Sequence, residues 1–215
     1  MHHAIPKVIC ATPEIKKLAL NELKNTCKQC NGCALFDTRT SVVFSDGNPS
    51  AKIILIGEAP GADEDSIGVP FVGKAGQLLN QFLIDAGLDR QKDIYICNTV
   101  KCRPPQNRVP TNEEKAACKA YLYGQIAIVN PKIILLCGAT AAELFIKEEF
   151  RVTELRGKWL NVFDNVDTMV IYHPSYLLRN HSMEEGTPRW FMAKDLLNIK
   201  RKLIEIEKEN GHEQN

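Results

Sequence analysis

Four short apolar runs of the sequence are each followed by residues suited to binding or catalysis. Gly57 and Glu58 follow the first run, Asn98 the second, Gly138 the third and His173 the fourth. If the runs are parallel strands, these residues all lie at the carboxyl ends of the strands, where open α/β sheets bind their ligands. The sequence therefore predicts one pocket that holds a carboxylate, an amide, an imidazole and two glycine turns.

The first run opens into a glycine-rich segment, residues 57–76. Glycines such as Gly57 and Gly61 let a backbone come close to a flat ligand, and they leave peptide N–H groups free to face a developing negative charge. Phe71 is either a core residue or a stacking platform for that ligand. The segment matches neither the dinucleotide-binding pattern nor the P-loop. A plain strand-to-helix loop remains the alternative interpretation.

The amide of Asn98 suits the recognition of a pyrimidine base. Uracil presents an N3–H donor beside an O4 acceptor, and one carboxamide can pair with both. Cytosine presents the opposite pattern, so the same amide would disfavour it. An asparagine just past a strand can also simply cap a turn, which is the structural alternative.

His173 opens a further segment of interest, which continues through Tyr176, Leu177, Leu178 and Arg179. A lone histidine is more often structural than catalytic, but this one ends a predicted strand and faces the predicted pocket. We interpret the two leucines as exposed. Apolar side chains beside an arginine would suit a wedge inserted into a base stack.

Eight cysteines in a chain with no secretory signal favour metal binding or core packing over a disulfide framework. Cys97 and Cys137 lie inside apolar runs and are typical core residues. Four thiols that could bind a structural zinc ion or an iron–sulfur cluster are Cys30, Cys33, Cys102 and Cys118. Cys27 extends the first pair into a spacing similar to that of ferredoxins, but no fourth cysteine followed by proline comes close behind.

The elements that must position these residues alternate between strands and helices. The predicted strands are Lys52–Ile56, Asp93–Cys97, Lys132–Cys137 and Thr168–Tyr172. The first predicted helix has Thr12 as its N-cap and Pro13 as its first residue. The other predicted helices are Ala75–Ala86, Thr111–Val129, Ala139–Lys147 and Arg189–Ile206. This order predicts a single-domain, three-layer α/β/α fold around a mostly parallel sheet. The apolar face of the last helix is expected to use Trp190, Ala193, Leu197 and Leu203.

Residues 1–26 are expected to form an N-terminal helical extension, residues 27–206 the domain, and residues 207–215 a polar, frayed tail. The 215 residues are 44% hydrophobic and 25% charged, with a net charge of +1, so a nucleic-acid binder would have to concentrate its positive charge locally. No apolar run is long enough to cross a bilayer. We therefore expect a cytoplasmic protein with no membrane partner, associated with the nucleoid if it is bacterial or archaeal. A monomer is the default expectation.

Taken together, these segments resemble the family 4 uracil-DNA glycosylases over roughly residues 30–202. The most specific matching motifs are Gly57-Glu58-Ala59-Pro60-Gly61, Pro70-Phe71-Val72-Gly73-Lys74-Ala75-Gly76, Val100-Lys101-Cys102-Arg103-Pro104-Pro105 and His173-Pro174-Ser175-Tyr176-Leu177-Leu178-Arg179. The resemblance implies an α/β/α fold and a [4Fe–4S] cluster. The implied cluster ligands are Cys30, Cys33, Cys102 and Cys118, which would make Cys27 a spectator.

The resemblance also implies that the chain releases uracil from single- or double-stranded DNA and leaves an abasic site. A glycosylase must flip the nucleotide out of the duplex to reach its bond. We expect Phe71 to stack on the flipped base, Asn98 to read it, and His173 with backbone N–H groups near Glu58 to stabilise the uracil anion. Residues from Tyr176 to Arg179, including Leu178, would fill the vacated stack.

The water-activating base is the remaining role. Ala59 stands where other uracil glycosylases have an aspartate. Glu58 is therefore the candidate base, with Glu64 and Asp65 as competitors. Glu64 has the alternative role of excluding the methyl group of thymine.

Three other functions compete with the glycosylase hypothesis. A related variant traps DNA covalently through a histidine in a basic insertion, but residues 103–110 contain no histidine. A non-catalytic nucleic-acid-binding module held by a four-cysteine metal site would bind DNA without releasing a base. An electron carrier could also use four cysteines, although nothing in the sequence indicates a redox partner.

Overall fold

The computed structural model describes residues 12–212. Residues 1–11 and 213–215, which include the start of the expected extension and the end of the expected tail, lie outside the described part. A six-stranded sheet has the order β1-β3-β2-β4-β6-β5. Its strands are β1 (Asp46–Gly47), β2 (Ile53–Gly57), β3 (Ile94–Asn98), β4 (Ile133–Cys137), β5 (Trp159–Phe163) and β6 (Val166–Ile171).

The four predicted strands form the parallel centre of this sheet, whereas both edge strands are antiparallel. Each residue of β2, β3 and β4 is buried, which explains the continuous apolar runs in the sequence. The sequence did not predict the two edge strands, β1 and β5. β1 has only two residues, and β5 is half-exposed and carries a register shift between Leu160 and Phe163.

The helices are α1 (Pro13–Lys28), α2 (Ala62–Ile67), α3 (Lys74–Asp85), α4 (Asn112–Val129), α5 (Ala139–Glu143), α6 (Val152–Leu155), α7 (Pro174–Leu177) and α8 (Pro188–His212), with short 3₁₀ turns η1 (Ala34–Phe36) and η2 (Pro105–Asn107). Thr12 caps α1 as predicted. Thr111 caps α4 in a capping box with Glu114, so the expected start of that helix is also confirmed.

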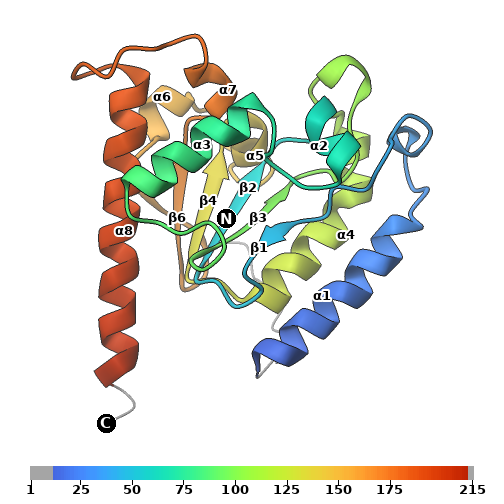
Figure 1. The fold of residues 1–215 in the computed structure, drawn as a ribbon, viewed down its shortest axis with the longest axis horizontal. Coiled ribbons are helices and arrows are strands. Elements are labelled where there is room, and N and C mark those ends of the chain that lie inside the picture. Colours follow the sequence, from blue (N-terminus) through green and yellow to red (C-terminus); the bar gives the residue numbers. More distant parts are fainter. Residues whose placement is uncertain (1–11, 213–215) are drawn as a thin grey trace.

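Helices cover both faces of the sheet (Figure 1). On one face α3, α7 and α8 pack on the alternate strand residues that include Leu55, Ile96 and Leu135. On the other face α1, α4 and α5 pack on the intervening residues, which include Ile54 and Leu136. This arrangement confirms the expected three-layer α/β/α architecture. It also gathers α2, α5 and α7 at one end of the sheet, the upper end in Figure 1.

Two helices differ from the prediction. α5 ends at Glu143, four residues before the expected Lys147, because the chain turns there. α8 continues to His212, beyond the expected end at Ile206. The predicted apolar face of α8 was wrong in part, since Leu197 is 45% exposed and the buried apolar positions are Met192, Leu196, Ile199, Leu203 and Ile206. These positions repeat every three or four residues and lie on one side of the helix.

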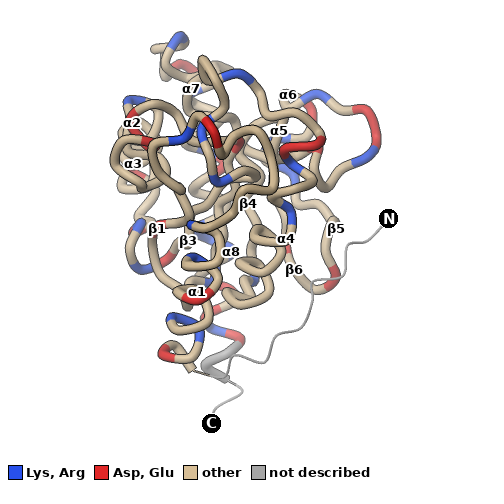
Figure 2. The backbone as a smooth tube through the Cα atoms, turned by 90° about the vertical axis from the view of Figure 1, so that its right-hand side faces the viewer, with Lys and Arg blue, Asp and Glu red and all other residues tan. Residues whose placement is uncertain are grey.

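No helix in residues 12–212 is both long and apolar enough to span a bilayer. Basic and acidic residues are interspersed along the backbone (Figure 2). Any contact with a polyanion therefore depends on a few local cations rather than on one uniformly basic face.

Candidate active site and cysteine-lined cavity

A cavity of about 300 Å³ lies at the carboxyl ends of β2 and β3. Its lining includes Glu58, Phe71, Asn98 and His173, together with Gly61, Glu64, Pro104, Asn107, Arg108 and Ser175. A larger hollow of about 880 Å³, lined by residues between Glu143 and Glu154, holds none of the predicted site residues. The structure thus brings the predicted carboxylate, amide and imidazole together in one place. We call this cavity the base pocket.

The Glu58 carboxylate is held by a residue that the sequence did not single out. Thr140, in the first turn of α5, donates a hydrogen bond from Oγ1 to Oε2 of Glu58. Thr140 is buried, and Glu58 is half-buried in the pocket wall. Its competitor Asp65 is buried elsewhere and accepts the backbone N–H groups of Thr40 and Ser41. Asp65 therefore has no access to the pocket.

Glu64 lines the pocket but is engaged by backbone donors. Its Oε1 accepts the N–H groups of Val72 and Gly73 at 2.9 and 2.8 Å, and its Oε2 accepts the N–H of Gly61 at 3.1 Å. A carboxylate with three such partners is well suited to hold two stretches of loop together. Glu64 thereby joins the first glycine turn to the segment that carries Phe71.

The ring of Phe71 lies directly over Gly57. A Cβ atom on Gly57 would come within 2.6 Å of the ring, so only glycine allows this approach. The backbone of Phe71 in turn rests on Gly76, where a Cβ would come within 2.1 Å of it. The ring centroids of Phe71 and His173 are 5.9 Å apart. Two glycines of the matching motifs thus place an aromatic face in the pocket wall.

His173 stands at the N-terminus of α7, and its ring caps that helix. The backbone N–H of Ser175 donates to Nδ1 at 3.3 Å, and Ser175 Oγ lies 2.7 Å from the same nitrogen. Burial lowers the pKa of His173 below its ordinary value, against the opposing effects of Glu58 and Glu64. A neutral imidazole whose Nδ1 accepts a hydrogen bond carries its proton on Nε2. This ring is therefore set up to donate through Nε2.

Asn98 has a buried amide with an unused acceptor. Within the described part of the chain, its Oδ1 has no hydrogen-bond partner and is excluded from solvent. Its backbone oxygen accepts a 2.6 Å hydrogen bond from Nζ of Lys101, which is itself fully buried. A buried carbonyl oxygen without a partner costs free energy unless a ligand supplies a donor. The pocket therefore offers an acceptor to a ligand N–H.

The segment after His173 differs from the prediction of two exposed leucines. Leu177 is fully buried and packs in the core beside α3 and α8, so that expectation was wrong. Leu178 is half-buried, while Tyr176 is 38% exposed and Arg179 is exposed. Neither Leu178 nor Arg179 is among the described residues that line the pocket. The exposed residues available beside the pocket are thus Tyr176 and Arg179.

A second, smaller cavity is lined by cysteines from two distant parts of the chain. Cys30 and Cys33 follow α1, Cys102 follows β3, and Cys118 lies in α4. Cys27, expected to be a spectator, lines the same cavity. Across residues 12–212, no three His, Cys, Asp or Glu side chains converge at the spacing that holds a single metal ion.

Positive groups surround the cysteine cavity. Arg39 donates to Sγ of Cys102 at 3.3 Å, the N–H of Gly32 donates to Sγ of Cys30 at 3.4 Å, and Lys101 also lines the wall. Burial raises the pKa of the Cys118 thiol to about 11, although the Lys101 charge acts in the opposite direction. The described lining contains no carboxylate and no histidine. Its possible metal ligands are therefore thiols and the phenol group of Tyr121, and its local charge is positive.

Sequence reasoning missed two residues that shape the base pocket. Thr140 comes two residues after Gly138, which the sequence predicts at the carboxyl end of a strand. Its place near the pocket could therefore have been predicted by the same rule. Arg90 lies in a loop after α3, and the sequence carries no signal for its contacts.

Comparisons with known proteins agree with this geometry. The uracil DNA glycosylase superfamily profile matches residues 44–197. A type-4 uracil-DNA glycosylase of Thermotoga maritima is 47% identical over 158 residues, 73% of this chain and 82% of that protein. One of Archaeoglobus fulgidus is 40% identical over 174 residues, 78% of this chain and 87% of that protein.

A type-5 uracil-DNA glycosylase of Thermus thermophilus is also similar, at 32% identity, but the match covers only 46% of this chain and 52% of that protein. The type-4 matches are both more similar and longer. This chain belongs to the type-4 uracil-DNA glycosylases of the uracil DNA glycosylase superfamily.

Proposed function

We propose that this enzyme hydrolyses the N-glycosidic bond of deoxyuridine in DNA, releasing uracil and leaving an abasic site. The observation that carries the proposal is the unpartnered, buried Oδ1 of Asn98 in the wall of the base pocket. That oxygen accepts the N3–H of uracil, and the amide N–H of the same side chain donates to O4. Cytosine lacks the N3–H donor, so the same oxygen would stay unpaired.

The bound base lies against Phe71. Stacking on an aromatic face contributes about 1–3 kcal/mol per base. The base reaches this position only after flipping out of the helix, where Tyr176, Leu178 and Arg179 lie beside the vacated stack. Lost pairing and stacking are thus replaced by contacts within the pocket.

Cleavage breaks the bond between C1′ and N1, and its electron pair leaves with the base. The uracil anion carries part of its charge on O2, and His173 donates to it through Nε2–H together with backbone N–H groups near Glu58. Such preorganised donors commonly provide the largest catalytic contribution. Water then adds to C1′, and Glu58, oriented by Thr140, accepts the proton that the water loses. The uracil anion is protonated by solvent after release.

The cysteine cavity is proposed to bind a [4Fe–4S] cluster through Cys30, Cys33, Cys102 and Cys118. The thiol-rich lining fits such a centre, and the cationic Arg39 and Lys101 would balance its negative charge. When bound, the cluster supplies structural cross-linking of the loop between Cys102 and Cys118. A yellow-brown absorption with about four irons and four sulfides per chain supports this assignment, whereas a colourless protein with zinc contradicts it.

Activity is tested with a labelled oligonucleotide that bears a single uracil, and alkali then cleaves at any abasic site. The control oligonucleotide carries thymine at the same position. We expect multiple turnovers at uracil only. Binding of DNA without release of a base would overturn the enzyme assignment and favour a DNA-binding module, while a stable protein–DNA adduct would favour the covalent trap.

A further inference from the structure

We infer that Arg90 is a positioning residue that holds Phe71 in the conformation required for stacking on the flipped base. This inference rests on the proposed function. Arg90 lies between α3 and β3 and is absent from the described lining of the base pocket. It therefore acts through the backbone of the segment that carries Phe71.

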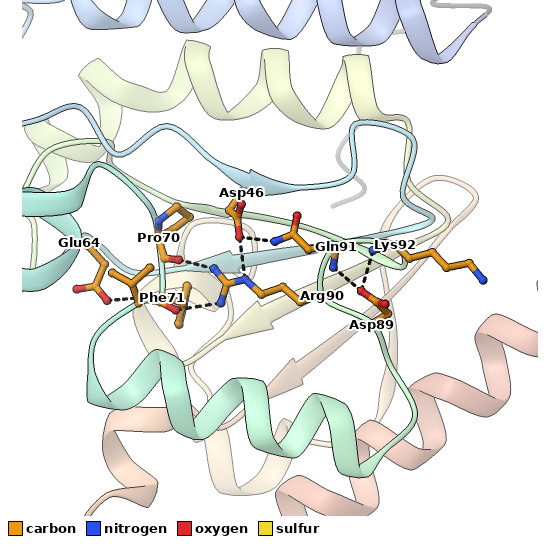
Figure 3. A network of polar contacts seen from close by, with 9 residues as sticks. Asp46, Glu64, Pro70, Phe71, Asp89, Arg90, Gln91 and Lys92 are labelled. Carbon is orange, nitrogen blue, oxygen red and sulfur yellow. Dashed lines mark hydrogen bonds and ion pairs between the residues drawn. The ribbon is translucent and has the colours of Figure 1, made fainter.

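The guanidinium of Arg90 forms a fork on two successive peptide units (Figure 3). Its Nη2 donates to the carbonyl oxygen of Pro70 at 2.6 Å, and its Nη1 donates to that of Phe71 at 2.9 Å. Glu64 holds the same segment from the other side. Its Oε1 accepts the N–H of Val72, in the same peptide unit as the Phe71 carbonyl group, and the N–H of Gly73, in the next unit. A cation thus holds two carbonyl groups and an anion holds the two following N–H groups.

This double hold acts on a strained backbone. Phe71 has φ of 54°, a left-handed conformation that is unfavourable for a bulky side chain. Such a residue persists only where the surrounding structure specifies it by several contacts. The conformation points the ring over Gly57 and towards His173, which is the geometry of the stacking platform.

Arg90 is itself held in place. Its Nε donates to Oδ2 of Asp46 at 2.8 Å, and only 12% of its side chain is exposed. The side chain of Asp89 accepts the N–H groups of Gln91 and Lys92, which shapes the turn around Arg90 (Figure 3). The fork geometry is specific to arginine, because a lysine ammonium cannot present two parallel donors to two carbonyl groups.

A double-mutant cycle tests whether Arg90 acts through Phe71. Single-turnover uracil release is measured for the wild type, Arg90→Met, Phe71→Ala and the double variant. We expect Arg90→Met to slow release about tenfold, because Phe71 can then leave its strained conformation. In the Phe71→Ala background the same change should slow release by less than about twofold, since coupled residues are non-additive. Full multiplication of the two effects, or no effect of Arg90→Met, would overturn the inference.

Gln91→Ala is the matched control. Gln91 lies on the same turn and donates to the same Oδ2 of Asp46 at 3.1 Å, without touching the Phe71 segment. We expect wild-type rates from it. Arg90→Lys keeps the cation beside Asp46 and covers the case in which Arg90→Met fails to fold. It should fold with a wild-type melting temperature and lose activity to an intermediate extent, whereas a wild-type rate would overturn the inference.

A second readout does not depend on catalysis. 4-Fluorophenylalanine at position 71 is followed by fluorine NMR in the wild type, Arg90→Met and Gln91→Ala backgrounds. We expect Arg90→Met alone to broaden or shift the signal; an unchanged signal would overturn the inference. If the wild type released no uracil, the proposed function would fail, while this measurement would still test the hold on Phe71.

Discussion

The base pocket and the cysteine cavity both gather residues from distant parts of the chain, but their side chains are held in different ways. In the base pocket, Glu58 is bound by Thr140, Phe71 by backbone contacts on both sides, and His173 by the cap of α7. In the cysteine cavity, hydrogen bonds to the thiol groups of the proposed ligands include those from Arg39 to Cys102 at 3.3 Å and from Gly32 to Cys30 at 3.4 Å. Hydrogen bonds to oxygen and nitrogen thus hold the side chains of the base pocket, whereas the thiol groups of the second region accept only weak hydrogen bonds and are proposed to bind a metal centre.

The two regions meet at Lys101. Its buried ammonium group lines the cysteine cavity and donates to the backbone oxygen of Asn98 in the base pocket. A buried cation is costly unless it is paired or hydrogen-bonded. The negative charge of thiolates on one side would offset this cost and at the same time support Asn98, the residue proposed to read the base.

The largest expected effect separates reading of the base from folding. Asn98→Ala removes the acceptor for N3–H and should slow single-turnover uracil release by about 100-fold or more. The melting temperature should stay within about 2 °C of the wild type, because Oδ1 has no protein partner to lose in residues 12–212. Asn161→Ala, at an exposed position of β5, is the control. A loss of activity matched by a loss of stability would remove the contrast between the two regions.

The opposite result is expected in the cysteine cavity. Cys102→Ala should abolish the iron–sulfur absorption and lower the free energy of unfolding by about 2–3 kcal/mol, since a bound centre stabilises only the folded state. Hydrogen exchange should rise first in residues 27–39 and 102–118. Protection that stayed unchanged in these segments would show that the cavity is as preorganised as the base pocket.

Lys101→Met tests the point where the two regions meet. Because a hydrogen bond from a charged group contributes about 1.5–3 kcal/mol, uracil release should slow by about tenfold to a hundredfold. The cluster should also be lost faster on exposure to a chelator. If the rate of release fell while retention of iron was unchanged, Lys101 would serve the base pocket alone.

Thr140→Val should slow uracil release by about tenfold, because it keeps the shape of the side chain but removes the donor to Glu58. Thr140→Ser restores a hydroxyl and should recover most of the rate. The predicted change lies in kcat rather than in KM, since Thr140 orients the carboxylate and does not contact the base. Failure of the serine variant to recover activity would indicate a packing role.

The smallest effect is the pH dependence set by His173. Burial lowers its pKa below the ordinary 6.5, so the ring is neutral above that pH and becomes protonated only below it. Protonated Nδ1 cannot accept the N–H of Ser175, and activity should therefore be flat above pH 6.5 and fall several-fold on the acid side. A rate profile of His173→Gln should lack this acid limb. An acid limb of equal size in that variant would assign the titration to another group.

Much of the site was predictable because the relevant signals are local. The buried parallel strands leave continuous apolar runs, and the residue that follows each run lies at the carboxyl end of its strand. From that rule alone, the sequence predicted that Glu58, Asn98 and His173 lie in one pocket, as they do in the structure. The sequence did not predict β1, because two residues are too few to show a pattern, or β5, whose register shift interrupts its pairing with β6. It also missed the burial of Leu177, because burial under neighbouring helices leaves no periodic pattern in so short a segment.

By itself, the sequence determined the alternation of strands and helices along the chain, the glycines that allow a close approach of the backbone, and the thiols available for a metal centre. Only the tertiary structure decided which side chains hold them. Thr140 reaches Glu58 across 82 residues of sequence, and Arg90 reaches Phe71 across 19. Such contacts depend on the angle and distance between separately folded elements, and residue type and spacing encode neither quantity.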